Sequence, residues 1–247
     1  MALLKTESIK KVYDGRTIIQ NINIELRKGE LVSLLGVSGS GKTTLFHVLS
    51  GLVRPEAGRV LLDGEDVTGK PGRISYMMQK DLLFPHKKII DNVSLPLILK
   101  GKSKAEARKE AASYFEGFGL SGTEMQYPSQ LSGGMRQRAA LLRTYLTGNA
   151  VALLDEPFSA LDTITKSAIH RWYLDVMQKI DLSTVFITHD IDEAILLSDR
   201  IYILQGIPGE IGTEIVISEP KPRRDEFVLS DSFLAYKRLI REKLAQD

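Results

Sequence analysis

The chain has 247 residues, of which 43% are hydrophobic, so it can bury the core of one globular domain with a subdomain or a tail. Its 33 Lys and Arg residues nearly balance its 31 Asp and Glu residues, and this composition does not indicate a nucleic-acid partner. The absence of Cys excludes disulfides and thiolate metal sites. Apolar runs fall short of the roughly 18 residues of a membrane span, and we expect no secretion signal.

Three strands and a helix are predicted in the first part of the chain. Glu7–Tyr13 and Ile18–Leu26 flank an Asp-Gly turn, and the second segment alternates apolar and polar residues, which indicates an antiparallel edge layer. Leu31–Leu35 is a continuous apolar run, as expected for a parallel strand buried on both faces. A helix that ends near Gly51 is predicted after it. Its apolar positions are Leu45, Val48, Leu49 and Leu52.

Further along, the pattern becomes helical from about residue 95 to residue 148, which predicts a helical subdomain. Strands are predicted again at Ala150–Leu154 and Thr184–Thr188, with a helix around Thr163–Lys179 between them. This alternation is typical of an α/β sheet.

The C-terminal residues 219–247 are interpreted as a linker and a final short helix, so the main domain covers residues 1–218. The linker interpretation rests on two prolines between Glu219 and Arg224. The final helix carries an apolar stripe of Phe233, Tyr236 and Ile240.

A glycine-rich loop with Walker A spacing follows the strand at Leu31–Leu35. Its glycines let backbone N–H groups point inward, and the following helix presents its positive end to phosphates. Lys42 is expected to bridge the β- and γ-phosphates of ATP, and the Thr43 hydroxyl to bind Mg²⁺. A Gly/Ser-rich loop without a ligand is the alternative. The residues expected to bind nucleotide here are Gly36, Ser38, Gly39, Ser40, Gly41, Lys42, Thr43 and Thr44.

Two adjacent carboxylates, Asp155 and Glu156, follow the strand Ala150–Leu154. On its own such a pair is more often an ordinary turn. Next to a Walker A loop, the end of a buried strand suits metal-assisted phosphoryl transfer, and the pair resembles Walker B. In that interpretation Asp155 holds Mg²⁺ through water, and Glu156 orients or deprotonates the attacking water.

The segment Leu131–Arg138 begins Leu-Ser-Gly-Gly, which locally reads as a helix start capped by Ser132. It lies between Lys42 and Asp155, and in this order of motifs the chain resembles the ATP-binding subunit of ABC transporters. The motifs run through most of the 247 residues. The resemblance implies an α/β fold with a P-loop NTPase core, a mostly parallel sheet, an antiparallel β edge layer and an inserted helical subdomain. It also implies that the signature residues Ser132, Gly133 and Gly134 bind the γ-phosphate of ATP held by a second subunit.

The same resemblance assigns roles to four more residues, each with a plainer alternative. His189 is the switch histidine that contacts the γ-phosphate and positions water, although Asp190 beside it would also cap a helix. Gln79 is the Q-loop residue that senses Mg²⁺ and the attacking water. Asp162 ends the D-loop and contacts the opposite subunit, or it caps a helix. Tyr13 stacks on adenine, or it packs as an ordinary strand tyrosine.

The resemblance implies a Mg²⁺-dependent ATPase that works as a head-to-tail dimer, most simply a homodimer, and drives solute transport. Separate transmembrane permease subunits would hold it at the cytoplasmic face of the membrane, and a solute-binding protein outside the cell membrane would complete the system. Phe84, in the apolar region Lys80–Leu99, is the candidate permease contact.

Import of a small organic or oxyanionic solute is favoured. Ile207–Ile211 and the Lys-Pro-Arg-Arg segment after Glu219 resemble the tails of nitrate, sulfonate, taurine and pyrimidine-precursor importers, although those tails carry other arginines. A soluble ABC ATPase of DNA repair or translation is the alternative, but such chains carry long coiled coils or two cassettes. A P-loop nucleotide kinase would not explain the signature or His189.

Overall fold

The computed structural model describes residues 2–159, 163–177, 179–223 and 225–245. Its larger sheet runs in the order β11-β10-β4-β9-β8-β7, in which only β11 is antiparallel to its neighbour among the described strands. The strands are β4 (Leu31–Gly36), β7 (Ser75–Met77), β8 (Val151–Asp155), β9 (Ser183–Ile187), β10 (Arg200–Gln205) and β11 (Glu210–Val216). Every residue of β4, β8 and β9 is buried, and β9 pairs parallel with both β4 and β8. This confirms the buried parallel strand expected at Leu31–Leu35 and the strands expected at Ala150–Leu154 and Thr184–Thr188.

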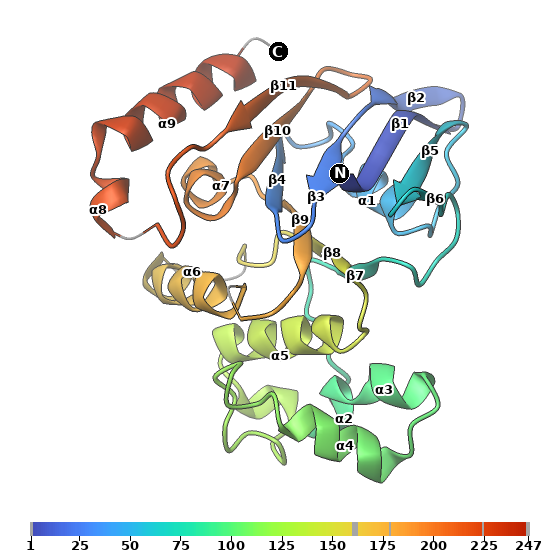
Figure 1. The fold of residues 1–247 in the computed structure, drawn as a ribbon, viewed down its shortest axis with the longest axis vertical. Helices are drawn as coiled ribbons and strands as arrows, with labels where there is room; N and C mark the ends of the chain where they lie inside the picture. The colour runs from blue at the N-terminus through green and yellow to red at the C-terminus, as the bar shows by residue number, and fades with distance from the viewer. Residues whose placement is uncertain (1, 160–162, 178, 224, 246–247) are drawn as a thin grey trace.

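A second sheet is antiparallel, in the order β2-β1-β5-β6 with β3 beside β1, which confirms the edge layer (Figure 1). Its strands are β1 (Ala2–Tyr13), β2 (Arg16–Ile22), β3 (Glu25–Arg27), β5 (Ala57–Leu62) and β6 (Glu65–Asp66). The single strand expected at Ile18–Leu26 is therefore two strands. The ladder breaks because Ser8 and Asn21 adopt φ values of 46° and 48°, and Oδ1 of Asn23 accepts a hydrogen bond from the Ser8 N–H at 2.9 Å.

The first helix, α1 (Lys42–Leu49), ends before Leu52, which is 59% exposed. The expectation that Leu52 belongs to the buried face was wrong. Gly51 turns the chain out of the helix with φ 76°, and a Cβ there would lie 2.6 Å from the Lys70 carbonyl oxygen.

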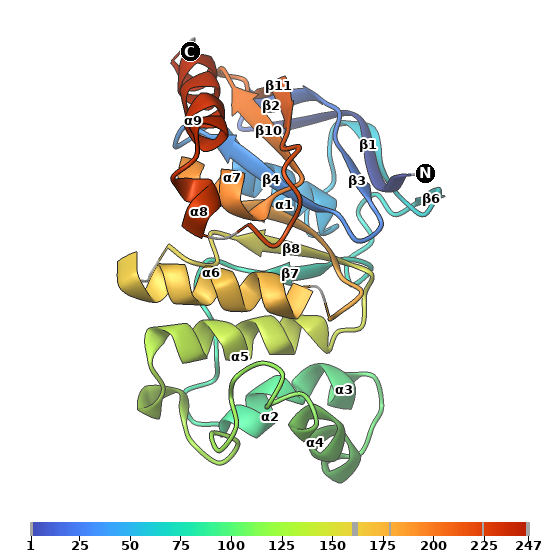
Figure 2. The ribbon, with the colours of Figure 1, turned by 60° about the vertical axis from the view of Figure 1, so that its left-hand side comes forward.

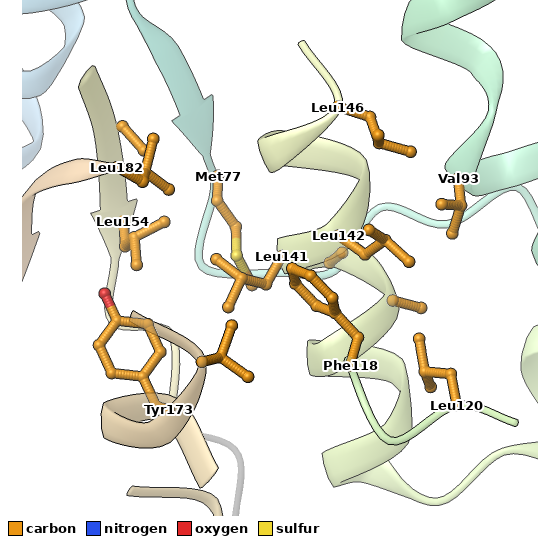
Figure 3. Packing of buried hydrophobic residues seen from close by; sticks show 14 of the residues in the cluster. Met77, Val93, Phe118, Leu120, Leu141, Leu142, Leu146, Leu154, Tyr173 and Leu182 are labelled. Atoms are coloured by element: carbon orange, nitrogen blue, oxygen red, sulfur yellow. The ribbon is translucent and has the colours of Figure 1, made fainter. Parts of the chain in front are cut away.

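The helical region begins at Ile89 rather than near residue 95, because Ile89, Ile90 and Val93 bury one side of an additional short helix. Its helices are α2 (Ile89–Val93), α3 (Leu95–Leu99), α4 (Lys104–Ala112) and α5 (Gly133–Tyr145), with a 3₁₀ turn at Pro128–Gln130. Figure 2 shows α5 side by side with α6 (Thr163–Met177), and these two helices lie between α2–α4 and the larger sheet. Figure 3 shows the shared core, where Met77 and Leu154 of the sheet face Leu141 of α5 and Tyr173 of α6.

The C-terminal segment packs on the sheet domain. Its helices are α8 (Asp225–Val228) and α9 (Asp231–Leu244), and α9 contacts α7 (Ile191–Leu197) of the sheet domain. The predicted stripe is confirmed, since Phe233 and Ile240 are buried and Tyr236 packs beside them. Arg223 is also buried, and its guanidinium donates to the carbonyl oxygens of Ile195 and Ser198 at 2.9 and 2.6 Å. Within the described ranges, no helix has the length and apolar character needed to span a bilayer.

Candidate functional site

The phosphate loop leaves β4 and enters α1 through left-handed glycines, with φ 85° at Gly39 and 98° at Gly41. A Cβ at Gly36 would lie 2.5 Å from the Leu204 carbonyl oxygen, so the loop packs closely on β10. Nζ of Lys42 donates to the carbonyl oxygens of Gly36 and Val37, both at 2.8 Å. Burial lowers the pKa of Lys42, while the nearby carboxylates at the end of β8 oppose that shift.

A cavity of about 400 Å³ opens at this loop. Its lining places an ammonium group, two hydroxyl-bearing α1 residues, a carboxylate and an imidazole around one space, which suits a polyphosphate anion with a hard cation. The predicted residues that line it are Gly36, Ser38, Gly39, Gly41, Lys42, Thr43, Thr44, Glu156 and His189, joined by Ile18 and Ile187. Ser40 is not among these lining residues. It is 1% exposed and lies close to Gly36 and Gly209, on the buried side of the loop.

Asp155 ends β8 and is buried beside this cavity's carboxylate, Glu156. Burial raises the pKa of the Asp155 carboxyl, and a hydrogen bond from the Tyr76 hydroxyl to Oδ2 at 3.0 Å opposes the rise. Burial also raises the pKa of Tyr76, so its hydroxyl remains a donor. The sequence alone does not indicate this role for Tyr76, because a tyrosine in a short strand such as β7 is usually interpreted as a packing residue.

The three residues predicted to be catalytic meet in the structure. Nε2 of Gln79 donates to Oε2 of Glu156 at 2.9 Å, and Nδ1 of His189 lies 3.3 Å from Oε1 of Glu156. Glu156 itself adopts φ 45°, an uncommon conformation for a residue other than Gly, and its N–H donates to the carbonyl oxygen of Ile187 at 3.0 Å. Both carboxylate oxygens are therefore held by groups that follow different strands.

The donors near this cavity fit Mg²⁺. Thr43 offers a hydroxyl oxygen, Asp155 a carboxylate and Gln79 an amide oxygen, since its Nε2 is already bonded to Glu156. In the described ranges no three His, Cys, Asp or Glu side chains gather as a metal cage. A Mg²⁺ ion here would be bound by a few protein oxygens together with phosphate oxygens of the nucleotide, as is usual in phosphoryl-transfer sites.

The signature residues lie elsewhere. Ser132 caps α5, and its Oγ accepts a hydrogen bond from the Met135 N–H at 3.3 Å, which confirms the local interpretation as a helix start. Gly133 and Gly134 form the first turn of α5. None of these three residues lines the cavity in the described part of the chain, and Figure 1 places α5 with the helical region, away from the junction of β4 and α1.

Two predicted contacts remain predictions. Tyr13 ends β1 with 40% of its surface exposed, so it is not a packed core tyrosine, and Nζ of Lys11 lies 4.9 Å from the centre of its ring. It is not one of the residues that line the cavity described above. Asp162 lies outside the described residues.

Comparison with known proteins places the chain in a family. Residues 19–159, which contain the phosphate loop, the signature and the acidic pair, match the family described as ABC transporter. The formylaminopyrimidine import ATP-binding protein ThiZ of Halalkalibacterium halodurans is 43% identical over 225 residues, covering 91% of this chain and 88% of that protein. The nitrate import ATP-binding protein NrtD of Synechocystis sp. is 38% identical over 221 residues, covering 88% and 83%.

Solved structures agree. The dimeric post-hydrolysis state of the ATP-binding cassette MJ0796, bound to ADP and Pi, is 29% identical with a TM-score of 0.75, covering 88% of this chain and 100% of that chain. CbiO1 from Clostridium perfringens shares the fold with a TM-score of 0.81 at 24% identity, covering 96% and 98%. This chain therefore belongs to the ABC transporter family.

Proposed function

We propose that this chain is the ATP-binding subunit of an ABC importer and that it hydrolyses ATP at the cavity beside Lys42 and Glu156. The observation that carries the proposal is the position of Glu156, which lines the cavity while Gln79 donates to one of its carboxylate oxygens and Nδ1 of His189 lies 3.3 Å from the other. Curated relatives named as import ATP-binding proteins support the importer class.

Each residue has a task in this hydrolysis. Lys42, whose ammonium now bonds to two carbonyl oxygens of the loop, would pair with the β- and γ-phosphates. Glu156 would accept a proton from the attacking water, and its two contacts restrict the direction of its carboxylate. His189, with Nδ1 toward Glu156, keeps Nε2 for the γ-phosphate. Mg²⁺, when bound, would neutralise charge on the phosphates.

The signature residues would act on the nucleotide of a second subunit. They stand at the N-terminus of a 13-residue helix, where free N–H groups and the helix dipole favour an anion. They are separate from the cavity of their own chain, so a head-to-tail dimer would bring them to the partner's γ-phosphate. The dimeric ADP- and Pi-bound relative supports this arrangement.

Transport would require separate permease subunits, and an import system would add a solute-binding protein outside the membrane. The chain would then lie at the cytoplasmic face, with Phe84, 40% exposed after Gln79, as a permease contact. The relatives import formylaminopyrimidine, nitrate and aliphatic sulfonates according to their names, which supports a small organic or oxyanionic solute here.

The test is purification of the tagged chain from gently solubilised membranes, followed by identification of the proteins that accompany it. A multi-span membrane protein is expected, and Phe84→Ala should weaken its recovery without changing ATP hydrolysis. Recovery with ribosomes or DNA-repair proteins, and without a membrane protein, would contradict the importer assignment.

A further inference from the structure

A chain of buried polar groups lies behind the pair Glu156 and His189. It consists of His170 on α6, Glu193 on α7 and Thr188 after β9, which are 7%, 3% and 2% exposed. Nε2 of His170 lies 2.9 Å from Oε1 of Glu193, and the Thr188 hydroxyl donates to Oε2 of the same carboxylate. Burying a carboxylate costs desolvation free energy unless its oxygens accept hydrogen bonds. The contacts of Glu193 with His170 and Thr188 offset that cost.

These buried polar groups fix the segment that contains His189. The Thr188 hydroxyl donates to Glu193 and also accepts the N–H of Asp190 at 3.0 Å, so it grips the backbone directly after His189. Asp190 caps α7 through the N–H groups of Asp192 and Glu193, at 3.0 and 3.2 Å. Burial would raise the pKa of Asp190, but the N–H of Glu193 and the charge of Lys166 outweigh it and lower that pKa.

The same histidine also contacts the segment that carries the carboxylate. The ring of His170 meets the ring of Phe158 edge to face, with centres 5.0 Å apart. Phe158 is 3% exposed and follows Glu156 by one intervening residue, Pro157. His170 is therefore packed against the segment of Glu156 and hydrogen-bonded toward the segment of His189, whose side chains lie 3.3 Å apart.

We propose that His170 is a positioning residue for ATP hydrolysis: through Glu193 and Thr188 on one side and Phe158 on the other, it holds His189 against Glu156. The inference rests on the proposed function, because it assumes that Glu156 and His189 act on ATP. His170 is separated from the cavity by these partners, so it is expected to affect the rate of hydrolysis and not the binding of nucleotide.

The test compares variants of the purified full chain by steady-state ATP hydrolysis and by ATP binding. His170→Leu fills the space but removes the hydrogen bond, and kcat is expected to fall roughly tenfold with KM little changed. His170→Gln keeps an N–H donor and should restore kcat to within about threefold of the unmodified chain. Tyr173→Leu is the matched control for the hydrogen bond: it disturbs the packing on Phe158 from the same helix, where the ring centres lie 5.5 Å apart, but leaves the bond between His170 and Glu193 in place, so kcat should fall less than in His170→Leu.

Three outcomes would overturn the inference. His170→Leu could keep full kcat, Tyr173→Leu could lower kcat equally, or His170→Gln could fail to restore it. If His170→Leu does not fold, Thr188→Val and Thr188→Ser decide, because only Val removes the hydroxyl: loss of kcat with Val alone supports the inference, and equal rates refute it. Glu156→Gln separates the two proposals, since wild-type hydrolysis in that variant contradicts the proposed function itself.

Discussion

Two regions of the molecule differ in how many functional groups they gather within one chain. One is the edge of the larger sheet that carries Lys42, Gln79, Glu156 and His189, called the catalytic edge below, and the other is the N-terminus of α5. Strands β4, β9, β8 and β7 are parallel neighbours, so the residues after their carboxyl ends gather at one edge of the sheet. This brings Lys42, Gln79, Glu156 and His189 together, although they are far apart in the sequence.

The signature residues, by contrast, complete only their own helix. Ser132 bonds to the N–H of Met135, and the first turn of α5 carries no acidic residue, so its positive end is not neutralised by its own side chains. The comparison teaches that one chain gathers the groups proposed for the chemistry around one cavity, whereas the signature residues lie apart from it and, in the proposed function, would meet the nucleotide of a second subunit. Dimerisation is then a requirement of the proposed reaction, and the variants below test that difference.

The largest effect is expected from Glu156→Gln. The amide keeps the shape of the side chain but cannot accept the proton of the attacking water, so kcat should fall by at least about a hundredfold. ATP binding should persist, because Lys42 and the loop remain intact. Hydrolysis under single-turnover conditions and equilibrium ATP binding measure the two effects. Binding that falls together with the rate would contradict a purely catalytic role.

Mixing two inactive variants tests whether the phosphate loop of one chain works with the signature residues of another. Lys42→Ala should lose ATP binding, and Ser132→Asp should keep the helix cap, since Asp is a good N-cap, while its charge repels a γ-phosphate. Each variant alone should be nearly inactive. Their mixture should regain hydrolysis, because one composite site would pair an unmodified loop with an unmodified signature.

Ser132→Thr is the control for this experiment, because it preserves a hydroxyl cap and should retain most activity. The ATPase rate as a function of mixing ratio is the measurement, with a maximum expected near equal amounts. A mixture that stays as inactive as its components would mean that each chain completes its own site.

A smaller effect is expected at the rear of the phosphate loop. A Cβ at Gly209 would lie 2.1 Å from the Ser40 carbonyl oxygen, so Gly209→Ala must shift the loop or the β10–β11 turn. ATP affinity should fall about tenfold, equivalent to about 1.4 kcal/mol. Gly117→Ala is the control, since its nearest neighbour would be 3.7 Å away. Equal affinities in both variants would show that the contact does not position the loop.

The parts of the fold that local pattern encodes were predictable. The apolar run Leu31–Leu35 predicts a buried parallel strand, and Ala150–Leu154 and Thr184–Thr188 predict further strands of an α/β sheet. The polar residues after these strands predict the site. The structure confirms those strands, and it brings Gln79 and His189 into contact with Glu156, which the sequence could not show.

The remaining features depend on contacts between distant residues. Strand β10 was not predicted. It begins with a buried Arg200, whose burial depends on distant partners: Glu30 accepts from Nε at 2.5 Å, and Glu214 accepts from Nη1 at 3.0 Å. The segment around Arg223 likewise reads as a linker until the carbonyl oxygens of Ile195 and Ser198 are known to receive its guanidinium. Gly209 offers no local signal of its approach to Ser40.

The smallest effect is expected in the helical region, far from the catalytic edge. Arg108 binds Asp91 through two hydrogen bonds of 2.9 and 2.7 Å, and these bonds lower the pKa of the Asp91 carboxyl. A lowered pKa means that the pair stabilises the ionised state at neutral pH, and that this contribution disappears as the pH falls through the folded-state pKa. Asp91→Asn should therefore lower the free energy of unfolding at neutral pH by about 0.5 kcal/mol, since Arg108 is 35% exposed and screened.

The difference between Asp91→Asn and the unmodified chain should shrink as the pH approaches and passes below the ordinary Asp value of 3.8. Urea unfolding at a series of pH values measures it, with Lys104→Met as a control that removes a more distant cation, 3.7 Å from Oδ1. The ATPase rate at neutral pH should not change, because this ion pair contributes nothing to the cavity. A rate that fell with the loss of this pair would instead mean that the helical region and the catalytic edge are coupled within a single chain.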